Sequence, residues 1–407
     1  MTSQPAAEVA RVGLLASIPR TVLLMIVIMA ANGLGFGFLM IYITAYLPQI
    51  GISASTAGLI VGIDGLSMGV VAIPFGLLSD RRGRKWLLIL GSLGVAPIFL
   101  IYAATTDVTA MVIAGLLGGV CEGTYLATVN AFIADQTTPK NRDSAFTLSF
   151  IIGGTGGTMG TALPFFVPEI ASRLAIKSSA LHSDLLYLFG FVSLVLALAL
   201  YAVIKDVPEV IKPGGTPWRG KTTTVLLKFS GINSLIGLGA GFIIPLIPTW
   251  LWLKFAVPDT YSGPLLAVAG TTIGLAAFFS PRIAREIGSV RAIVLTQGLS
   301  VAFMLALAFE GNVLAAAAIY VVRTMLMNMA SPLMDSYLMG IVVPEQRGFA
   351  SSVNSVIWRI PNSITTFIGG IILSSGNFAL PFILAGSFYA VAISLFYPTF
   401  RNVKPLG

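Results

Sequence analysis

The sequence predicts an all-α membrane protein with twelve transmembrane helices, arranged as two pseudo-symmetric bundles of six. Three observations predict this fold. The 407 residues are 56% hydrophobic and 10% charged, whereas about a quarter of the residues of a soluble domain are charged. Twelve apolar segments are long enough to cross a bilayer, which takes about 20 residues each. Motifs of the first half also recur in the second half at a nearly constant spacing.

The apolar segments are separated by short polar connections. The first segment follows a polar tail and is longer than the core of a signal peptide, so we expect it to stay in the mature protein as a membrane helix. The twelve predicted helices span roughly residues 22–48, 56–79, 86–105, 109–133, 145–168, 184–204, 223–253, 262–281, 292–309, 312–343, 349–374 and 377–398.

The basic residues predict the orientation in the membrane. With both termini in the cytoplasm, 18 of the 24 Lys and Arg residues fall on the cytoplasmic side, 3 on the other side and 3 within helices. Such an excess in cytoplasmic connections is the usual pattern of multi-pass proteins of the cell membrane. It also explains the net charge of +8 without a nucleic-acid partner, because the basic residues form no continuous face or arm.

The longest cytoplasmic connection divides the chain. KDVPEVIKPGGTPWRGK, which starts at Lys205, contains the proline, glycine and charged residues that are typical of a linker. We therefore expect an N-terminal six-helix bundle over residues 1–204, a cytoplasmic linker over residues 205–222 and a C-terminal six-helix bundle over residues 223–407.

The two halves carry related motifs. GLGFGF at residues 33–38 recurs as GLGAGF at residues 237–242, a shift of 204 residues. Repeated halves with a substrate site between them are a common plan of secondary transporters. Three further residues recur at a shift of 205, namely Gly83 as Gly288, Pro139 as Pro344 and Arg142 as Arg347.

The connection between the second and third segments concentrates charge. GLLSDRRGRK, residues 76–85, holds one acidic and four basic side chains and two glycines. It resembles the signature of the major facilitator superfamily, Gly-x-Leu-x-Asp-Arg-x-Gly-Arg-Lys/Arg, and matches every defined position. The resemblance implies the major facilitator fold over the whole chain, with twelve helices, cytoplasmic termini and a central linker.

The resemblance also implies a cytoplasmic gate at this connection, closed when the protein opens outward. Asp80 would accept hydrogen bonds from the start of the eleventh helix, and Arg84 would reach Asp135 at the end of the fourth. The alternative is a positive anchor that only sets topology, which we expect of Arg82 and Lys85. Gly76 would admit a neighbouring helix and Gly83 would allow a tight turn. The residues assigned to the gate are Gly76, Asp80, Arg81, Gly83, Arg84 and Asp135.

Three departures from the family's pattern bear on the transport mode. The second-half counterpart PRIAREIGSVR has Arg285 where the first half has Asp80. The arginine that the family often carries in its fourth helix is replaced by Gly115. GGTGGTMGTALP in the fifth helix resembles the pattern of proton-linked drug antiporters only loosely. The chain resembles drug/proton antiporter-like members most closely in pattern, but it lacks their full set of motifs.

Charged residues within the predicted helices are the candidates for substrate binding and proton coupling. A charge in the hydrocarbon layer costs several kcal/mol and usually has a partner or a function. Lys228 lies close enough to the cytoplasmic surface for its ammonium group to reach water. Six such residues occur, namely Asp64, Glu122, Lys228, Arg323, Asp335 and Arg359.

Depth along the helices suggests two ion pairs. At about 1.5 Å per residue, Asp335 and Arg359 lie roughly 12 and 15 Å from the cytoplasmic ends of their helices, so they can meet as a structural or a moving pair. Glu122 and Arg323 both lie near the midplane. A carboxyl group shielded from water can exchange a proton near neutral pH, and we expect Glu122 to alternate between Arg323 and substrate. A satisfied structural acid is the alternative.

Asp64 is a second candidate proton site, or an acid that faces water in the outer vestibule. Among the neutral polar side chains, Asn32 and Trp358 lie deepest in their helices and are the candidates for lining a substrate pocket. Aromatic residues near helix ends belong more often to the interfacial belt.

These features predict a secondary active transporter that works as a monomer. It would move a small organic solute by rocker-switch alternating access, with protons as the coupling ion. We rank export of drugs or metabolites first. A symporter or uniporter of an organic anion or sugar is the alternative, favoured by the two buried arginines.

Other function classes fit the sequence less well. The sequence has no His-Glu-x-x-His or Gly-x-Ser-x-Gly motif of an enzyme and no phosphate-binding loop for ATP. The single cysteine Cys121 and the single histidine His182 leave little for a metal site, and no cofactor is expected. A transporter-like sensor without flux would usually need a signalling tail, and both tails are short.

Overall fold

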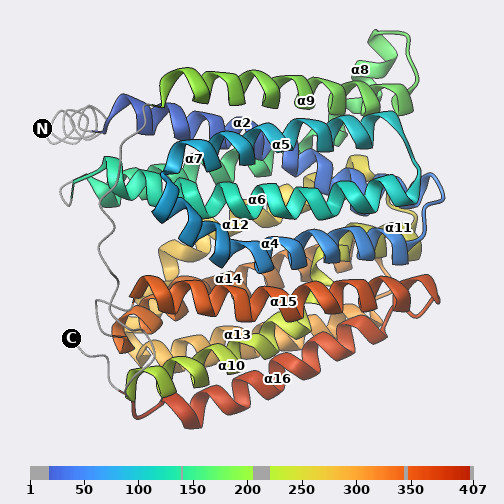
Figure 1. The fold of residues 1–407 in the computed structure, drawn as a ribbon. Coiled ribbons are helices and arrows are strands. Elements are labelled where there is room, and N and C mark those ends of the chain that lie inside the picture. The colour runs from blue at the N-terminus through green and yellow to red at the C-terminus, as the bar shows by residue number, and fades with distance from the viewer. Residues whose placement is uncertain (1–17, 139–140, 205–220, 343–346, 404–407) are drawn as a thin grey trace, which may run out of the picture. The chain divides into compact units, whose positions relative to one another are not determined.

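The computed structural model describes residues 18–138, 141–204, 221–342 and 347–403, and all regular structure within them is helical (Figure 1). Within this part of the chain, eleven helical segments are long and apolar enough to cross a membrane. The predicted fold class is confirmed, because each predicted segment corresponds to one helix or to consecutive helices.

The first six predicted helices begin a few residues before their expected starts, and their ends lie close to the expected ones. The first and fifth are each continued by a short turn of π- or 3₁₀-helix and a further α-helical piece. The elements are α2 (Arg20–Ile41), η1 (Tyr42–Tyr46), α3 (Leu47–Gln49), α4 (Ala54–Arg82), α5 (Arg84–Ala104), α6 (Val108–Gln136), α7 (Arg142–Ala162), η2 (Leu163–Phe166), α8 (Val167–Arg173) and α9 (Ser178–Val203).

The last six repeat this pattern, and the seventh is likewise interrupted, by a 3₁₀ turn at Pro245. Proline has no N–H to donate, so it interrupts the helical hydrogen bonds at this point. The elements are α10 (Lys221–Gly241), η3 (Ile244–Leu246), α11 (Ile247–Phe255), α12 (Asp259–Ile287), α13 (Ser289–Phe309), α14 (Val313–Ile341), α15 (Arg347–Ser374) and α16 (Leu380–Phe400).

The repeated GLGxGF motif makes the same kind of contact in both halves. In α2, a Cβ atom placed on Gly33 would lie 3.2 Å from the carbonyl oxygen of Gly153 in α7. In α10, the corresponding Gly237 lies against the carbonyl group of Trp358 in α15. Small residues let two helix backbones approach this closely. The repeat therefore encodes two equivalent helix crossings, first with fifth and seventh with eleventh.

The repeated glycines Gly83 and Gly288 also have one conformation. Gly83 has φ 90° and ψ 156°, and Gly288 has φ 86° and ψ 149°. Positive φ is strained for residues with a side chain. Each glycine joins two long helices, α4 to α5 and α12 to α13, which confirms the tight turn predicted at Gly83.

The described residues form two compact units. The first unit takes in residues up to Leu39, then Val71–Thr161 and the segment that begins at Ala171. The second takes in Met40–Val70, Ala162–Ile170 and the second half of the chain. The division of the sequence at residues 205–222 stays a prediction, because residues 205–220 lie outside the described part.

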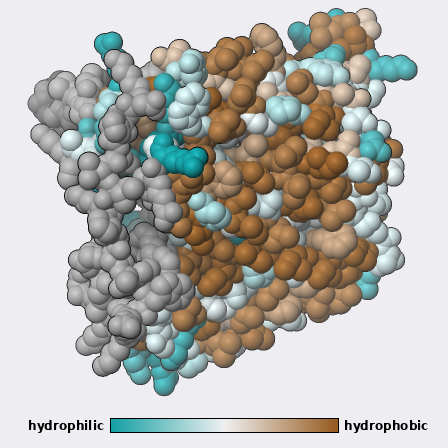
Figure 2. All heavy atoms as spheres, viewed as in Figure 1, coloured by the Kyte–Doolittle hydropathy of each residue, from teal (hydrophilic) through white to brown (hydrophobic). Residues whose placement is uncertain are grey.

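Each unit has its own apolar core. Met25, Leu88 and Val129 are fully buried in the first, and Trp250 and Phe382 in the second. Large apolar side chains also cover much of the outer surface between the helix ends, on the face drawn in Figure 2. An apolar surface of this extent is typical of a protein surrounded by lipid.

Candidate functional site

Arg84 connects three helices at the predicted cytoplasmic gate. Its Nε donates to Oδ2 of Asp135, at the end of α6, over 2.8 Å. A terminal guanidinium nitrogen donates to Oγ of Ser79 in α4 over 3.1 Å. The expected contact between Arg84 and Asp135 is therefore present, within the first unit. An ion pair combined with hydrogen bonds orients its partners more precisely than charge alone.

The remaining gate residues are less completely described. The side chains of Asp80 and Arg81 lie outside the described part of the structure, as does the side chain of Arg347 at the start of α15. No described atom lies within 4 Å of a Cβ placed on Gly76. The close helix approach expected at Gly76 is therefore not seen among the described residues.

A glycine stripe at the other end of α4 forms a close contact with α15, which we call the α4–α15 seam. A Cβ on Gly62 would lie 2.7 Å from the carbonyl oxygen of Ser363, closer than such atoms approach in proteins. The backbone N–H of Ser55 donates to Oγ of Ser374 over 2.8 Å. The stripe consists of Gly58, Gly62, Gly65 and Gly69.

The α4–α15 seam was not predicted, although the sequence carries a signal for it. The four glycines recur at intervals of four, three and four residues, which places them on one face of a helix. Small residues with this spacing are a recognised feature of helix contacts in membranes. A hydrogen bond also joins α3 to α12 in the second unit, where Nε2 of Gln49 donates to Oδ1 of Asp259 over 3.2 Å.

Arg359 lies where the α4–α15 seam ends. A Cβ on Gly69 would lie 3.7 Å from Cδ of Arg359, whose side chain is half-buried. Asp64 is also half-buried and lies on α4 between Gly62 and Gly65. The seam thus carries one acidic and one basic candidate residue on its two helices.

The predicted ion pair between Asp335 and Arg359 is not formed in this structure. No salt bridge joins these two described residues, and the side chain of Asp335 is exposed. Similar depth brings two residues together only if their helices pack with those faces toward each other. Here α15 packs on α10 and on α4 rather than closely on α14.

Arg323 is buried within the second unit, with 4% of its surface exposed. A terminal guanidinium nitrogen donates to the hydroxyl of Tyr389 over 2.9 Å, and the guanidinium lies 5.5 Å from the centroid of that ring. Within the second unit, the guanidinium of Arg323 therefore has a phenol of α16 as its partner. The pairing with Glu122, which belongs to the first unit, stays a prediction. The aromatic face and the hydroxyl oxygen both favour the cation.

Glu122 and Asn32 belong to the first unit. Glu122 is half-buried in the middle of α6. Asn32 is 6% exposed, and its Oδ1 accepts from Oγ of Ser193 over 3.1 Å. Asn32, which we expected to line a substrate pocket, therefore joins α2 to α9 within the first unit.

Trp358 belongs to the second unit and is half-buried beside Gly237. One turn earlier on α15, Asn354 accepts from Nδ2 of Asn233 over 3.1 Å. The α10–α15 contact is therefore partly polar. Among the described residues, no group of three His, Cys, Asp or Glu side chains could hold a metal ion.

Known proteins match most of the chain and agree on one family. The family model described as Major Facilitator Superfamily matches residues 25–232 and 229–406. Multidrug resistance protein 1 of Bacillus subtilis (strain 168) is 25% identical over 375 residues, which cover 89% of this chain and 92% of that protein. The class H tetracycline resistance protein of Pasteurella multocida is 24% identical over 306 residues, 72% of this chain and 74% of that protein.

A solved structure shows the same fold. The bacterial homologue of the human lysosomal transporter Spinster, in an inward-facing and unoccupied conformation, superposes with a TM-score of 0.73. The match covers 94% of this chain and 96% of that chain at 15% sequence identity.

Proposed function

The chain belongs to the major facilitator superfamily, and we propose that this transporter exports small organic solutes in exchange for protons. Membership makes the chain a multi-pass membrane transporter rather than an enzyme. The observation that carries the export proposal is the similarity to the multidrug resistance protein, which extends over 89% of this chain and 92% of that protein. We place both termini in the cytoplasm of the cell and treat the monomer as the working unit.

The state of Arg323 bears on the alternative function, transport of an organic anion or sugar. The two arginines in the membrane favour an anionic substrate. Arg323, however, is 4% exposed and donates to Tyr389, so it is used within the bundle. Arg359 is then the remaining basic candidate, and the export of apolar compounds fits the site better.

The two ends of α4 supply the gates for a rocker-switch cycle. The glycines of the α4–α15 seam occupy the first half of the helix, and Ser79 of the Arg84 cluster lies near its end. A helix of 29 residues is about 44 Å long at 1.5 Å per residue, enough to cross the bilayer. We assign the seam to the outer gate. The Arg84–Asp135 pair lies within the first unit, and we assign it to holding the cytoplasmic end of α4 in place at the cytoplasmic gate.

Glu122 is the proposed proton carrier, with Asp64 and Asp335 as secondary candidates. An ionisable side chain in the middle of a membrane helix is costly and is usually retained for function. Proton exchange at Glu122 would then alternate with binding of substrate.

Transport by purified protein in liposomes tests the proposed function. A tetracycline and a panel of sugars and organic acids are offered to vesicles with and without a pH gradient. We expect protein facing inside-out to accumulate the tetracycline in an acidic lumen, and a protonophore to abolish the accumulation. Gradient-driven movement of only a sugar or an organic acid would favour the alternative, and no movement of any solute would contradict both.

Replacing Arg84 with alanine is expected to reduce the transport rate about tenfold, equivalent to about 1.4 kcal/mol, with little loss of folded protein. The pair is partly exposed, with 16% of the Arg84 side chain and 32% of the Asp135 side chain accessible, and such pairs contribute less than about 1 kcal/mol to stability. Initial transport rates and thermal unfolding in detergent measure the two effects separately.

The matched control for this variant is Arg82→Ala, which removes a basic residue assigned only to topology. A double-mutant cycle with Asp135→Ala tests the pair itself, and we expect the two losses to be less than additive. Equal losses in Arg82→Ala and Arg84→Ala would contradict a specific role for the pair.

A further inference from the structure

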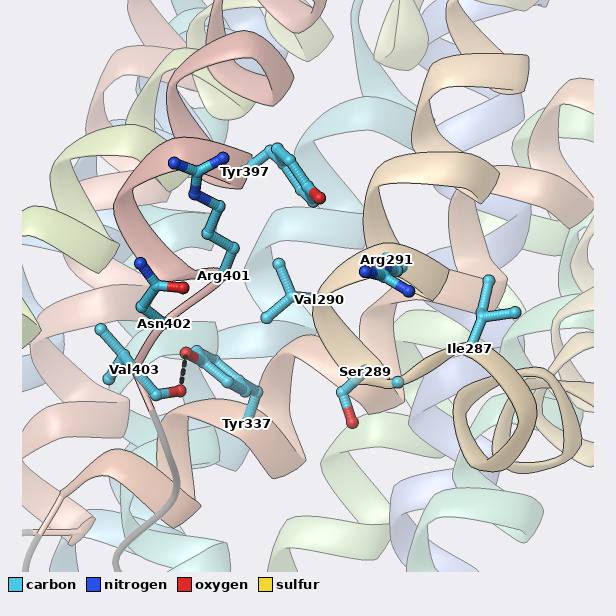
Figure 3. Close-up of a pocket in the computed structure, with 10 residues that line it drawn as sticks. Ile287, Ser289, Val290, Arg291, Tyr337, Tyr397, Arg401, Asn402 and Val403 are labelled. Carbon is cyan, nitrogen blue, oxygen red and sulfur yellow. Dashed lines mark hydrogen bonds between the residues drawn. The ribbon is translucent and has the colours of Figure 1, made fainter.

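A cavity of about 530 Å³ opens within the second unit, where three helices end or begin (Figure 3). The start of α13 forms one side, the end of α16 forms another, and Tyr337 of α14 lies between them. The transport cycle proposed above uses none of these residues. The cavity is lined by Ile287, Gly288, Ser289, Val290, Arg291, Tyr337, Tyr397, Arg401, Asn402 and Val403.

The lining favours an anion. Among the described residues, it includes two guanidinium groups, those of Arg291 and Arg401, and no carboxylate. Gly288 is the N-cap of α13, which has no side-chain cap and no acidic residue in its first turn. The first N–H groups of a helix are free to donate and carry the positive end of the helix dipole. Three sources of positive potential therefore meet at one cavity.

The cavity walls are preorganised. The hydroxyl of Tyr337 donates to the carbonyl oxygens of Phe400 and Val403, over 3.2 and 3.0 Å, and so fixes the turn that follows α16. The guanidinium of Arg401 lies 5.9 Å from the centroid of the Tyr397 ring. The first contact holds the turn after α16 against α14, and the second orients the guanidinium of Arg401 at the end of α16.

The rest of the lining is partly apolar, beside the polar side chains of Ser289 and Asn402, which indicates an amphipathic ligand. Ile287 is 37% exposed, and Val290 and Tyr397 are half-buried. A free inorganic anion would gain nothing from these side chains, whereas the glycerol and upper acyl part of a lipid would contact them. The connection at Gly288 is the repeat of the connection at Gly83. With the termini in the cytoplasm, as proposed, the cavity faces the leaflet where anionic lipids attract basic side chains.

We propose that this cavity binds a phosphate ester, supplied by the headgroup of an anionic phospholipid. Arg291 and Arg401 hold the phosphate oxygens, the free N–H groups of α13 add further donors, and Ile287 and Val290 contact the apolar part of the lipid. Bound lipid would then join the start of α13 to the end of α16. The proposal concerns binding alone and does not depend on the direction or coupling of transport.

The test measures lipid binding by the purified full-length protein in neutral detergent. Mixed micelles of phosphatidylglycerol or phosphatidylcholine are titrated, and thermal stabilisation and the mass of bound lipid are recorded. We expect phosphatidylglycerol to bind the unaltered protein at least about tenfold more tightly than phosphatidylcholine, and the variant Arg291→Gln/Arg401→Gln to lose this preference. The matched control Arg282→Gln/Arg285→Gln removes two exposed basic residues of α12 that do not line the cavity. This control variant should keep the preference for phosphatidylglycerol.

Three outcomes would overturn the proposal. Equal losses in the two double variants would mean that the preference reflects general surface charge. Equal affinity for the two lipids would mean that the cavity does not select an anion. Stabilisation by inorganic phosphate or glycerol phosphate as strong as that by phosphatidylglycerol would assign the cavity to a soluble phosphate and remove the lipid.

Discussion

Replacing Glu122 with glutamine is expected to abolish transport driven by a pH gradient, while exchange of substrate across the membrane continues. Glutamine has the shape of the protonated acid but cannot release a proton, so the carrier can still change conformation with substrate bound. The gradient-driven rate should fall by at least about tenfold, and the remaining exchange should no longer depend on pH. Both quantities are measured in the same proteoliposomes, with and without a gradient.

The conservative variant Glu122→Asp retains a carboxyl group and should keep part of the coupled rate. Glu286→Gln, which neutralises an exposed acid at the end of α12, is the matched control and should leave coupling intact. If Glu122→Gln transports with an unchanged pH dependence, the proton is carried elsewhere. Asp64 and Asp335 are then the next residues to neutralise.

Introducing leucine at Gly62 is expected to lower the transport rate by at least about tenfold, because the α4–α15 seam can no longer close. A Cβ at this position would lie 2.7 Å from the backbone oxygen of Ser363, and a helix backbone cannot move aside as a side chain can. Gly62→Ala should show a smaller effect in the same direction. The transporter would accumulate in the state in which the seam is open.

Disulfide cross-linking reports the state of the seam directly. In a Cys121→Ser background, cysteines at Ser55 and Ser374 should cross-link readily, since the backbone N–H of one and the Oγ of the other are 2.8 Å apart. Gly62→Leu should slow this cross-link. Gly154→Leu, at a glycine of α7 with no described atom near its Cβ, should affect neither cross-linking nor transport. Rapid cross-linking in Gly62→Leu would contradict the seam as a gate.

The membrane helices and their repeat were predictable because they depend on local properties. Length and hydropathy identify a helix that must satisfy its own backbone hydrogen bonds in lipid. The equal backbone angles of Gly83 and Gly288 follow from a residue type that alone adopts them freely. The glycine stripe of α4 also depends only on local sequence, because its small residues recur at helical spacing.

The partners of the membrane charges were less predictable, because depth specifies only one of the coordinates that a contact requires. Asp335 and Arg359 have similar depths but lie on helices that are not packed closely against each other. Arg323 was expected to meet an acid, and its partner is the phenol of Tyr389, 66 residues further along the chain. An aromatic residue in an apolar helix gives no sign in the sequence that it will accept a hydrogen bond from a buried cation.

The sequence by itself determined the membrane-spanning class, the order of the helices, the duplicated halves and the superfamily, because each depends on hydropathy, on residue type or on spacing along one helix. The pairing of Arg84 with Asp135 was also within reach, since the motif placed Arg84 at a helix end and the end of the fourth predicted helix placed Asp135 on the same side of the membrane. Only the tertiary structure decided which faces of the helices meet. Which faces meet depends on close packing between segments far apart in the chain. This packing places Gly62 against Ser363, lets Arg323 donate to Tyr389 and places Arg291 and Arg401 in the lining of one cavity.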